Sequence, residues 1–453
     1  MFDEDEIKTL MNRIYKLSPS RATEVILWVT EQTTLRFANN QIVQTVAEEN
    51  ATVSIRILHD DRMGRAATNK FDEKSLSQCC EKALELAKNA QPDPDALPLP
   101  GAQAYQPVNA DFDATRYASA YQMANQVEEM IAEGEEDEIS LSGINQIRTH
   151  IKAIGNSQGL LAVHRSTQAI ASVTATYSEA TGWAIIDDPD IRQIDHLALA
   201  QTAIEKAKLS TKRVTIEPGE YTVILEPQAV ANLLSFLVLD YVAQISPFSG
   251  TAVLKDVGFV ARHRGETFFS ERFTLHDDVF HPLQQGIPFD GEGMPRKPVT
   301  LVENGMLKDL VHSRSSALKM GAEPTGHGLE LPNSYGAIPD RLIMEGGDSH
   351  LEEMIRKTDR GLLVTRFWYN RLVDSNSLTV TGMTRDGTFL VEDGVIVGAV
   401  NNMRLNESLF HLFRNIIDLG KPVRILEEES EWVMVVPPIR VAGVRFTDQT
   451  FFG

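Results

Sequence analysis

The order of hydrophobic and polar residues predicts an unusual helix in the stretch from Gly219 to Gln244. A short alternating strand ends at Glu226-Pro227, and twelve of the fifteen residues from Ala229 to Ala243 are apolar. A helix of this composition is buried on nearly every side. At about 100° per residue, its three polar residues lie within an arc of about 140°; they are Asn232, Ser235 and Asp240.

This narrow polar face has two interpretations. An unpaired polar group in a protein core costs about 1 to 3 kcal/mol. The three side chains therefore either find hydrogen-bond partners inside the core or face a cavity. The pattern alone leaves both interpretations open.

The first part of the chain alternates with period two after a short amphipathic helix, Asp3 to Leu17. Such alternation predicts an antiparallel meander with tight turns. The predicted strands are Glu24 to Thr30, Thr33 to Ala38, Gln41 to Glu49, Thr52 to His59 and Gly64 to Thr68, with turns at Asn39-Asn40 and Asp60-Asp61. A helix from Glu73 to Asn89 is expected to cover one face. The proline-rich segment that follows is predicted to be extended and to run along the protein surface.

A Gly-x-Ser-x-Gly sequence, Gly155 to Gly159, lies between two further alternating segments, Glu138 to Ala153 and Leu160 to Glu179. The nucleophile elbow of a hydrolase needs a helix directly after the serine. Here the period-two alternation continues instead. We therefore predict a hairpin turn with Ser157 in it, and no serine nucleophile.

The length of 453 residues is sufficient for two hydrophobic cores. Helices Ala114 to Glu133 and Ile194 to Leu209 complete a first half, and the polar junction Ser210 to Pro218 follows. We predict an N-terminal α/β domain over 1–212 and a C-terminal strand-rich domain over 213–453. The second half is expected to contain strands at Thr267 to Leu275, Thr300 to Val302 and Leu307 to His312.

Two histidines, His276 and His281, flank the carboxylates of Asp277 and Asp278 and suggest a metal site. On a strand, a spacing of five directs the two rings to opposite faces. On a helix they would be about 140° apart. The pattern favours a surface loop over a metal site.

The composition of the chain argues against several kinds of binding partner and site. The net charge of −20 opposes a nucleic-acid backbone. The two cysteines, Cys79 and Cys80, are adjacent and form neither a disulfide framework nor a CxxC site. The acidic runs Glu133 to Glu138 and Glu427 to Glu431 are predicted to be solvated. The acidic N-terminus and the lack of an apolar run of about 18 residues predict a cytoplasmic protein that does not bind membranes.

Three motifs together resemble the central signature of the TldD/PmbA (TldE) family. They are Phe289 to Gly293 (FDGEG), Thr300 to Leu307 (TLVENGML) and Pro324 to Gly328 (PTGHG). Other segments are similar to family segments in the same order: Arg62 to Arg65, Gly155 to Gly159, Asp277-Asp278, and Phe389 to Val400 with Glu392-Asp393-Gly394.

The resemblance implies an α+β fold, with an N-terminal α/β domain and a C-terminal strand-rich, barrel-like domain. It also implies a cytoplasmic peptidase that works as a dimer enclosing a cavity. In TldD-type members the central helix carries His-Glu-x-x-x-His, in which two histidines hold zinc and the glutamate is the base. Aligned from the strand Thr222 to Leu225, these positions are Ser235, Phe236 and Asp240 here. None of the three residues suits its task.

The chain therefore resembles the PmbA (TldE) branch, which lacks the metal motif. The resemblance implies no catalytic or metal-binding residue and no cofactor in this chain, a TldD-like HExxxH subunit as zinc-holding heterodimer partner, and unfolded peptide as substrate. Candidates for lining the substrate chamber are Asn232, Ser235, Asp240, Asp290, Glu292 and His327. Two alternatives stay open. One is a non-proteolytic binding regulator, in line with the family's description as a modulator of DNA gyrase, and the other is a self-sufficient homodimeric hydrolase.

Overall fold

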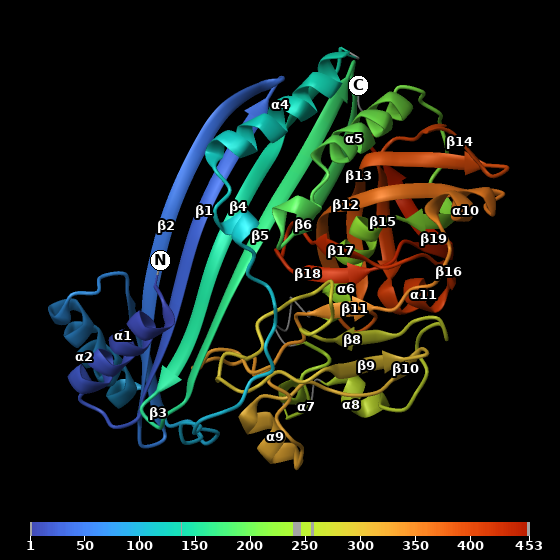
Figure 1. The fold of residues 1–453 in the computed structure, drawn as a ribbon. Coiled ribbons are helices and arrows are strands. Elements are labelled where there is room, and N and C mark those ends of the chain that lie inside the picture. Colours follow the sequence, from blue (N-terminus) through green and yellow to red (C-terminus); the bar gives the residue numbers. More distant parts are fainter. Residues whose placement is uncertain (1, 137, 239–245, 255–257, 451–453) are drawn as a thin grey trace.

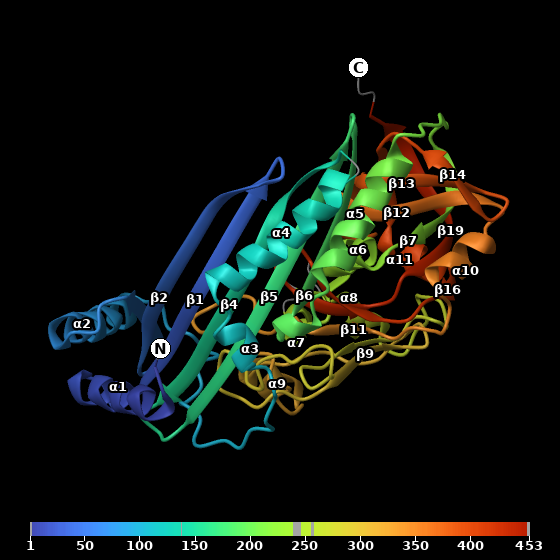
Figure 2. The same cartoon turned by 45° about the horizontal axis from the view of Figure 1, so that its top comes forward.

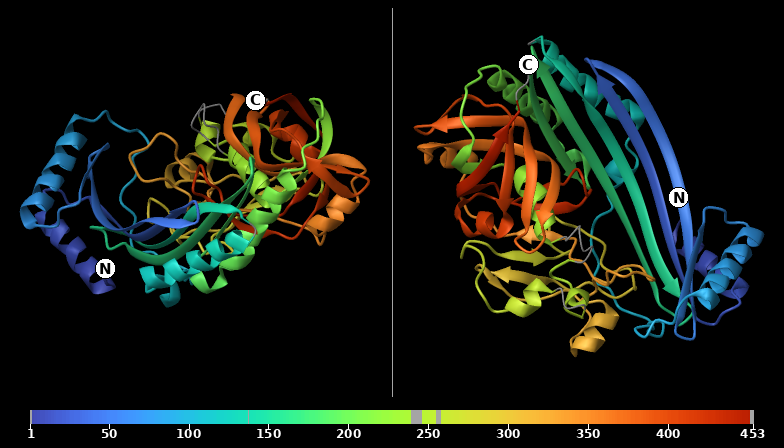
Figure 3. Two further views of the ribbon diagram at one scale, coloured as in Figure 1. Left: turned by 90° about the horizontal axis from the view of Figure 1, so that it is seen from above. Right: turned by 180° about the vertical axis from the view of Figure 1, so that it is seen from behind.

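The computed structural model describes residues 2–136, 138–238, 246–254 and 258–450 (Figure 1). A long curved sheet forms the N-terminal half, and a barrel with a second, smaller sheet forms the C-terminal half. Seen from behind, the long strands of the N-terminal sheet run along one side of the C-terminal domain (Figure 3). No helix of the described residues is long and apolar enough to cross a membrane.

The N-terminal sheet has six antiparallel strands in the order β3-β2-β1-β4-β5-β6. Their bounds are β1 Thr23–Ala38, β2 Gln41–His59, β3 Arg62–Thr68, β4 Ser140–Asn156, β5 Leu161–Tyr177 and β6 Ala180–Asp188. The predicted meander and its turns are confirmed, and Asn39 and Asn40 both have positive φ. The predicted breaks within β1 and β2 are wrong, because polar residues such as Glu31 and Glu49 pair directly across the ladder.

Two pairs of helices cover one face of this sheet. Figure 2 shows α1 (Glu4–Leu17) and α2 (Glu73–Asn89) at one end, and α4 (Ala120–Glu136) and α5 (His196–Ser210) over the other. The short helices α3 (Asp113–Arg116) and η1 (Ile191–Gln193) lie beside them. Odd-numbered residues of β1 fill both cores, with Val25 and Leu27 under the first pair and Leu35 and Phe37 under the second. The even-numbered residues therefore face away from the helices.

Five strands of the C-terminal domain close into a barrel in the order β12-β7-β19-β15-β13, and β13 pairs back with β12. These strands are β7 Gly219–Leu225, β12 Arg360–Asp374, β13 Thr379–Glu392, β15 Met403–Ser408 and β19 Ile439–Gln449. Strands β14 (Val395–Ala399) and β16 (Ile416–Leu419) pair with β13 and β19 respectively. The closed ring confirms the expected barrel-like domain.

A second six-stranded sheet has the order β10-β9-β8-β11-β18-β17. Its strands are β8 Leu275–Asp277, β9 Val299–Glu303, β10 Met306–Leu307, β11 Leu342–Met344, β17 Val423–Leu426 and β18 Val433–Val436. The remaining helices are α6 Pro227–Val238, α7 Gly250–Leu254, α8 Phe259–His263, α9 Arg314–Met320, α10 Leu351–Arg356 and α11 Leu409–Arg414.

Helix α6 lies between the barrel and the second sheet, where it packs on β7, β12, β17 and β18. All eleven residues from Gln228 to Val238 are buried. The hydrophobic pattern therefore predicted the environment of the described part of this helix correctly.

Candidate functional site

The polar face of α6 is held by hydrogen bonds inside the core. The side-chain amide of Asn232 donates to Glu427 Oε1 at 2.7 Å, and its Oδ1 accepts the backbone N–H of Phe367 on β12 at 3.1 Å. Ser235 Oγ donates to the backbone carbonyl of Asn232 at 3.0 Å. For Asn232 and Ser235, the structure thus supports the interpretation of internal partners.

The family resemblance aligns Ser235, Phe236 and Asp240 with the zinc motif of TldD-type members, and the structure shows the surroundings of the first two. Ser235 is a neutral hydroxyl that is already bonded within its own helix, and Phe236 is a buried aromatic ring. Asp240 lies outside the described residues. The two described side chains do not match the imidazole and carboxylate donors of a catalytic zinc site.

The prediction that the acidic run Glu427 to Glu431 is solvated is wrong for Glu427, whereas Glu428, Glu429 and Glu431 are exposed. Glu427 is 2% exposed and also accepts the backbone N–H and the hydroxyl of Ser430. Glu428 pairs with Arg366 of β12, and Glu431 pairs with Arg148 of β4. The prediction failed for Glu427 because its partner Asn232 lies 195 residues away in the sequence.

The FDGEG motif forms a tight buried loop around Asp290. Asp290 Oδ1 accepts the backbone N–H groups of Glu292 and Met294, both at 2.9 Å. Its Oδ2 accepts the N–H of Gly328 at 2.7 Å and so joins FDGEG to PTGHG. Gly328 has no side chain, and a Cβ there would lie 2.3 Å from Glu292 Oε2. The two motifs therefore form one unit.

His327 belongs to a buried charge network beside this loop. Its Nε2 lies 2.8 Å from Asp277 Oδ1, and Arg296 bridges Asp277 to Asp340. Burial alone would raise the pKa of Asp277, but Arg296 and His327 hold it below its ordinary range. An ionised, fully paired Asp277 fixes the two loops against strand β8.

Glu292 faces the N-terminal domain from this unit. Its Oε2 accepts the backbone N–H of Arg314 at 2.9 Å. Burial and the neighbouring Asp290 raise the pKa of Glu292 to about 7, and Arg56 of the N-terminal sheet opposes the shift. Glu292 is therefore a buried carboxyl that titrates near neutral pH.

The opposite side of this junction is a cluster of charges on the N-terminal sheet. Glu24 is buried between Arg56, which donates through two nitrogens, and Arg65. Arg65, from the Arg62 to Arg65 motif, also donates to the carbonyl of Leu331. Lys152 adds an ion pair with Glu330 at 3.4 Å. The motif of the first domain thus contacts the segment that follows PTGHG.

Apolar and aromatic contacts complete the junction. Phe289 of FDGEG packs with Ile26, Ile154 and Leu160 of the N-terminal domain. Tyr105, from the proline-rich segment, donates to the carbonyl of Gly293 at 2.8 Å. The motifs that suggest the family therefore build a contact between the two domains. Asp290 and Glu292 are buried at this contact, and His327 is buried beside it against Asp277 of β8. The hydrogen bonds of Asn232 are instead to Glu427 and Phe367. The role of all four residues as chamber residues stays a prediction.

Ser157 lies in the turn between β4 and β5, as predicted. Its Oγ donates to the carbonyl of Arg21 at 2.6 Å and accepts the N–H of Thr23 at 3.1 Å. The side chain is thus used to fix the entry into β1.

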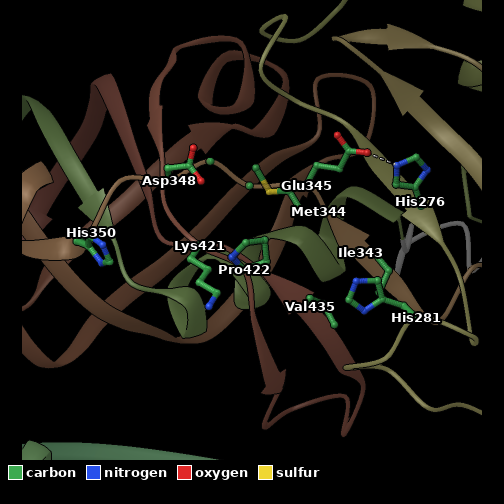
Figure 4. A pocket seen from close by; sticks show the side chains of 12 residues that line it. His276, His281, Ile343, Met344, Glu345, Asp348, His350, Lys421, Pro422 and Val435 are labelled. Carbon is green, nitrogen blue, oxygen red and sulfur yellow. Dashed lines mark hydrogen bonds and ion pairs between the residues drawn. The ribbon is translucent and has the colours of Figure 1, made fainter.

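A cavity of about 800 Å³ opens on the other side of strand β8 (Figure 4). His276, Ile343 and Val435 form one row across β8, β11 and β18 and line it. His281 lines the same cavity, because the strand ends at Asp277 and the chain turns back. The predicted surface loop is thus wrong for His276, which lies on a strand.

Two of the three histidines that line this cavity, His276 and His281, have other partners. His276 Nε2 lies 2.9 Å from Glu345 Oε1, and its Nδ1 lies 3.1 Å from Thr300 Oγ1. His281 Nδ1 accepts the N–H of Leu283 at 3.2 Å, and burial lowers the pKa of His281. Over residues 2–136, 138–238, 246–254 and 258–450, no three His, Cys, Asp or Glu side chains form a group that could hold a metal ion.

Comparison with known proteins gives matches along almost the whole chain. The model of the PmbA/TldA metallopeptidase C-terminal domain matches residues 218–448, that of domain 1 matches 24–87, and that of the central domain matches 69–211. The chain is 23% identical to Metalloprotease PmbA of Escherichia coli O157:H7, over 87% of this chain and 86% of the relative. It is 22% identical to a Metalloprotease PmbA homolog of Haemophilus influenzae, over 97% of both.

Solved structures show the same fold. The crystal structure of TldE from Thermococcus kodakarensis superposes with a TM-score of 0.85 at 22% identity, over 98% of this chain and 100% of that one. A Thermotoga maritima protein described as a modulator of a DNA gyrase gives a TM-score of 0.83 at 21% identity, over 97% and 100%. These likenesses confirm the predicted α+β fold.

Proposed function

The chain belongs to the PmbA/TldA metallopeptidase family, and on this basis we propose that it is the subunit of a TldD/TldE-type zinc metallopeptidase that binds no metal itself. Zinc and the catalytic glutamate come from a TldD-like partner with an intact HExxxH motif. The complex degrades or matures unfolded peptides in the cytoplasm.

One observation carries this proposal. In helix α6 the hydroxyl of Ser235 is bonded to the carbonyl of Asn232, and the next residue is the buried Phe236. By the family resemblance, we align these two residues with a zinc-binding histidine and the catalytic glutamate of TldD-type members. A neutral hydroxyl committed to its own helix and an aromatic ring supply neither a zinc ligand nor a base.

The experiment is co-expression of this chain with a TldD-type subunit from the same cell. We expect a 1:1 complex by size exclusion, with one zinc per complex by elemental analysis. The complex should cleave an unstructured peptide that this chain alone leaves intact. A chelator and replacement of the partner's HExxxH glutamate should each abolish cleavage.

Two results would overturn the proposal. The first is separate homodimers with no gain of cleavage over the partner alone. The second is about one zinc per chain in this protein after dialysis on its own, together with peptide cleavage. That second result would instead support a self-sufficient hydrolase, whereas peptide binding without cleavage in any mixture would support a non-proteolytic regulator.

A further inference from the structure

Four side chains form an exposed stack on the barrel. The ring centroids of Trp368 and Tyr369 are 5.4 Å apart. The guanidinium of Arg385 lies 4.2 Å from the centroid of the Trp368 ring, and that of Arg371 lies 4.1 Å from the centroid of the Tyr369 ring. We call these four residues the aromatic–arginine stack.

A bulge in β12 exposes the stack. Trp368 pairs with Met383 and Arg371 pairs with Thr381, so that Tyr369 and Asn370 together oppose one residue of β13. Tyr369 has a φ of 57°, which a bulky residue rarely adopts. The result is that two adjacent aromatic residues are both in solvent, with Trp368 46% and Tyr369 60% exposed. Bulges are a common device for redirecting side chains next to functional sites.

Glycine makes this bulge possible on the opposite strand. Gly382 faces the extra residue, and a Cβ at this position would lie 2.0 Å from Asn370 Oδ1. The buried side chain of Asn370 therefore occupies the space that a side chain at position 382 would fill. The exposure of Trp368 and Tyr369 is thus built into both strands.

The stack presents positive charge that the described structure leaves partly unpaired. Arg385 is 3.5 Å from Asp386, whose Oδ2 also accepts from Arg366 Nε at 3.0 Å. Within the described part of the chain, Arg371 forms no ion pair with a carboxylate, and its Nη1 donates to the carbonyl of Asn370. A guanidinium that stacks on a ring keeps its N–H edge free for a carboxylate.

The stack also adjoins the central helix. Phe367, directly before Trp368, donates its N–H to Asn232 of α6, and the N–H of Tyr369 bonds Glu429 of the acidic turn. Tryptophan, tyrosine and arginine are the residues most enriched at binding hot spots. The net charge of −20 repels acidic peptides in general, so that holding an acidic segment requires a local cationic surface such as this one.

From these contacts we propose that the aromatic–arginine stack binds a carboxylate side chain of an extended peptide. Arg371 and Arg385 donate to the carboxylate, and the exposed rings contact the apolar part of the neighbouring residue. This inference rests on the proposed function, because it assigns acidic segments as preferred substrates of the same protein.

The test uses the full chain and two fluorescent, N-acetylated and C-amidated peptides that differ only in Glu replaced by Gln. Fluorescence anisotropy should show the Glu peptide binding about tenfold more tightly, as expected for a charge-assisted pair. Added salt should reduce this preference. Arg371→Gln and Tyr369→Ala should each lower the affinity for the Glu peptide to that for the Gln peptide.

The chain offers matched controls. Arg360→Gln removes an exposed arginine, 63% exposed, at the other end of β12, and Tyr117→Ala removes an exposed tyrosine that lies beside Arg116 in the N-terminal domain. Both variants should keep the preference for the Glu peptide. Equal binding of the two peptides, or an unchanged preference in Arg371→Gln, would overturn the inference.

Two outcomes separate this inference from the proposed function. If the complex with a TldD-type subunit cleaves peptides but shows no Glu preference, the stack has another role and the function stands. If the Glu peptide binds as expected and no mixture cleaves it, the inference stands and the peptidase role fails. Should Tyr369→Ala not fold, Arg371→Gln alone decides, because it retains both rings of the stack.

Discussion

Replacement of Asn232 tests whether the polar face of α6 is structural. In Asn232→Ala, Glu427 loses a donor at 2.7 Å and the N–H of Phe367 loses its acceptor at 3.1 Å. A hydrogen bond to a charged group contributes about 1.5 to 3 kcal/mol, and a buried unsatisfied N–H costs about 1 to 3 kcal/mol. We therefore expect a loss of about 3 to 5 kcal/mol in the free energy of unfolding of the C-terminal domain.

The assay combines urea unfolding with hydrogen exchange measured by mass spectrometry. Exchange should accelerate in the segment that contains Phe367, because its N–H loses the side-chain acceptor. Ser235→Ala is the matched control on the same helix. Within the described part of the chain, Ser235 donates to the carbonyl of Asn232 in its own helix, so the loss of its hydroxyl should cost less than about 1 kcal/mol.

An opposite pattern would refute this reasoning. If Asn232→Ala unfolds within about 1 kcal/mol of the unchanged protein and Phe367 keeps its protection, the two hydrogen bonds do not hold the helix in place. The polar face would then be free to line a cavity, the alternative that the sequence left open. The variant Asn232→Asp adds a second carboxylate beside Glu427. It should destabilise the C-terminal domain at neutral pH, and less so in acid.

Three further predictions concern the junction between the domains and the Gly-x-Ser-x-Gly turn. Glu24→Gln leaves Arg56 and Arg65 without their shared carboxylate and should lower the free energy of unfolding by about 3 to 5 kcal/mol, measured by the urea midpoint; an unchanged midpoint would refute it. The folded-state pKa of Glu292 is about 7 against an ordinary 4.5. The free energy of unfolding should therefore fall by at most about 3 kcal/mol as pH rises from about 4.5 to 7. Glu292→Gln should remove this pH dependence of the free energy of unfolding between pH 5 and pH 8. Ser157→Ala should cost about 1 kcal/mol of stability and leave peptide cleavage by the complex intact; loss of cleavage in a folded variant would restore the nucleophile interpretation.

Local patterns predicted those parts of the fold that depend on neighbouring residues. Period-two alternation identified the antiparallel meander, and Asn39-Asn40 marked a turn that needs positive φ at both positions. The apolar run identified α6 as buried. Closure of the barrel was implied only by the family resemblance. Strand β7 pairs with β12 and β19, which lie far away in the sequence, and a periodic pattern within one segment does not indicate such distant partners.

The candidate site was predictable only in part for the same reason. Asp290, Glu292 and His327 were chosen from motifs. The structure places Asp290 and Glu292 in the loop whose Phe289 packs on the N-terminal sheet, and His327 against Asp277 of β8. The burial of Glu427 could not be foreseen, because its partner is 195 residues away. The stack at Trp368 depends on a bulge, which has no simple signature in sequence.

The pairing of the first and last strands of the barrel sets an order of events during synthesis. β7 pairs with β19, and at about 5 to 20 residues per second a ribosome adds the residues between Leu225 and Ile439 in roughly 10 to 40 s. During this interval the apolar surface of α6, next to β7, lacks its final cover. The N-terminal sheet needs only residues up to Asp188 and can form first. It then offers the nascent C-terminal loops a preformed template, and any delay in finishing the chain prolongs the time in which chaperones and proteases compete for α6.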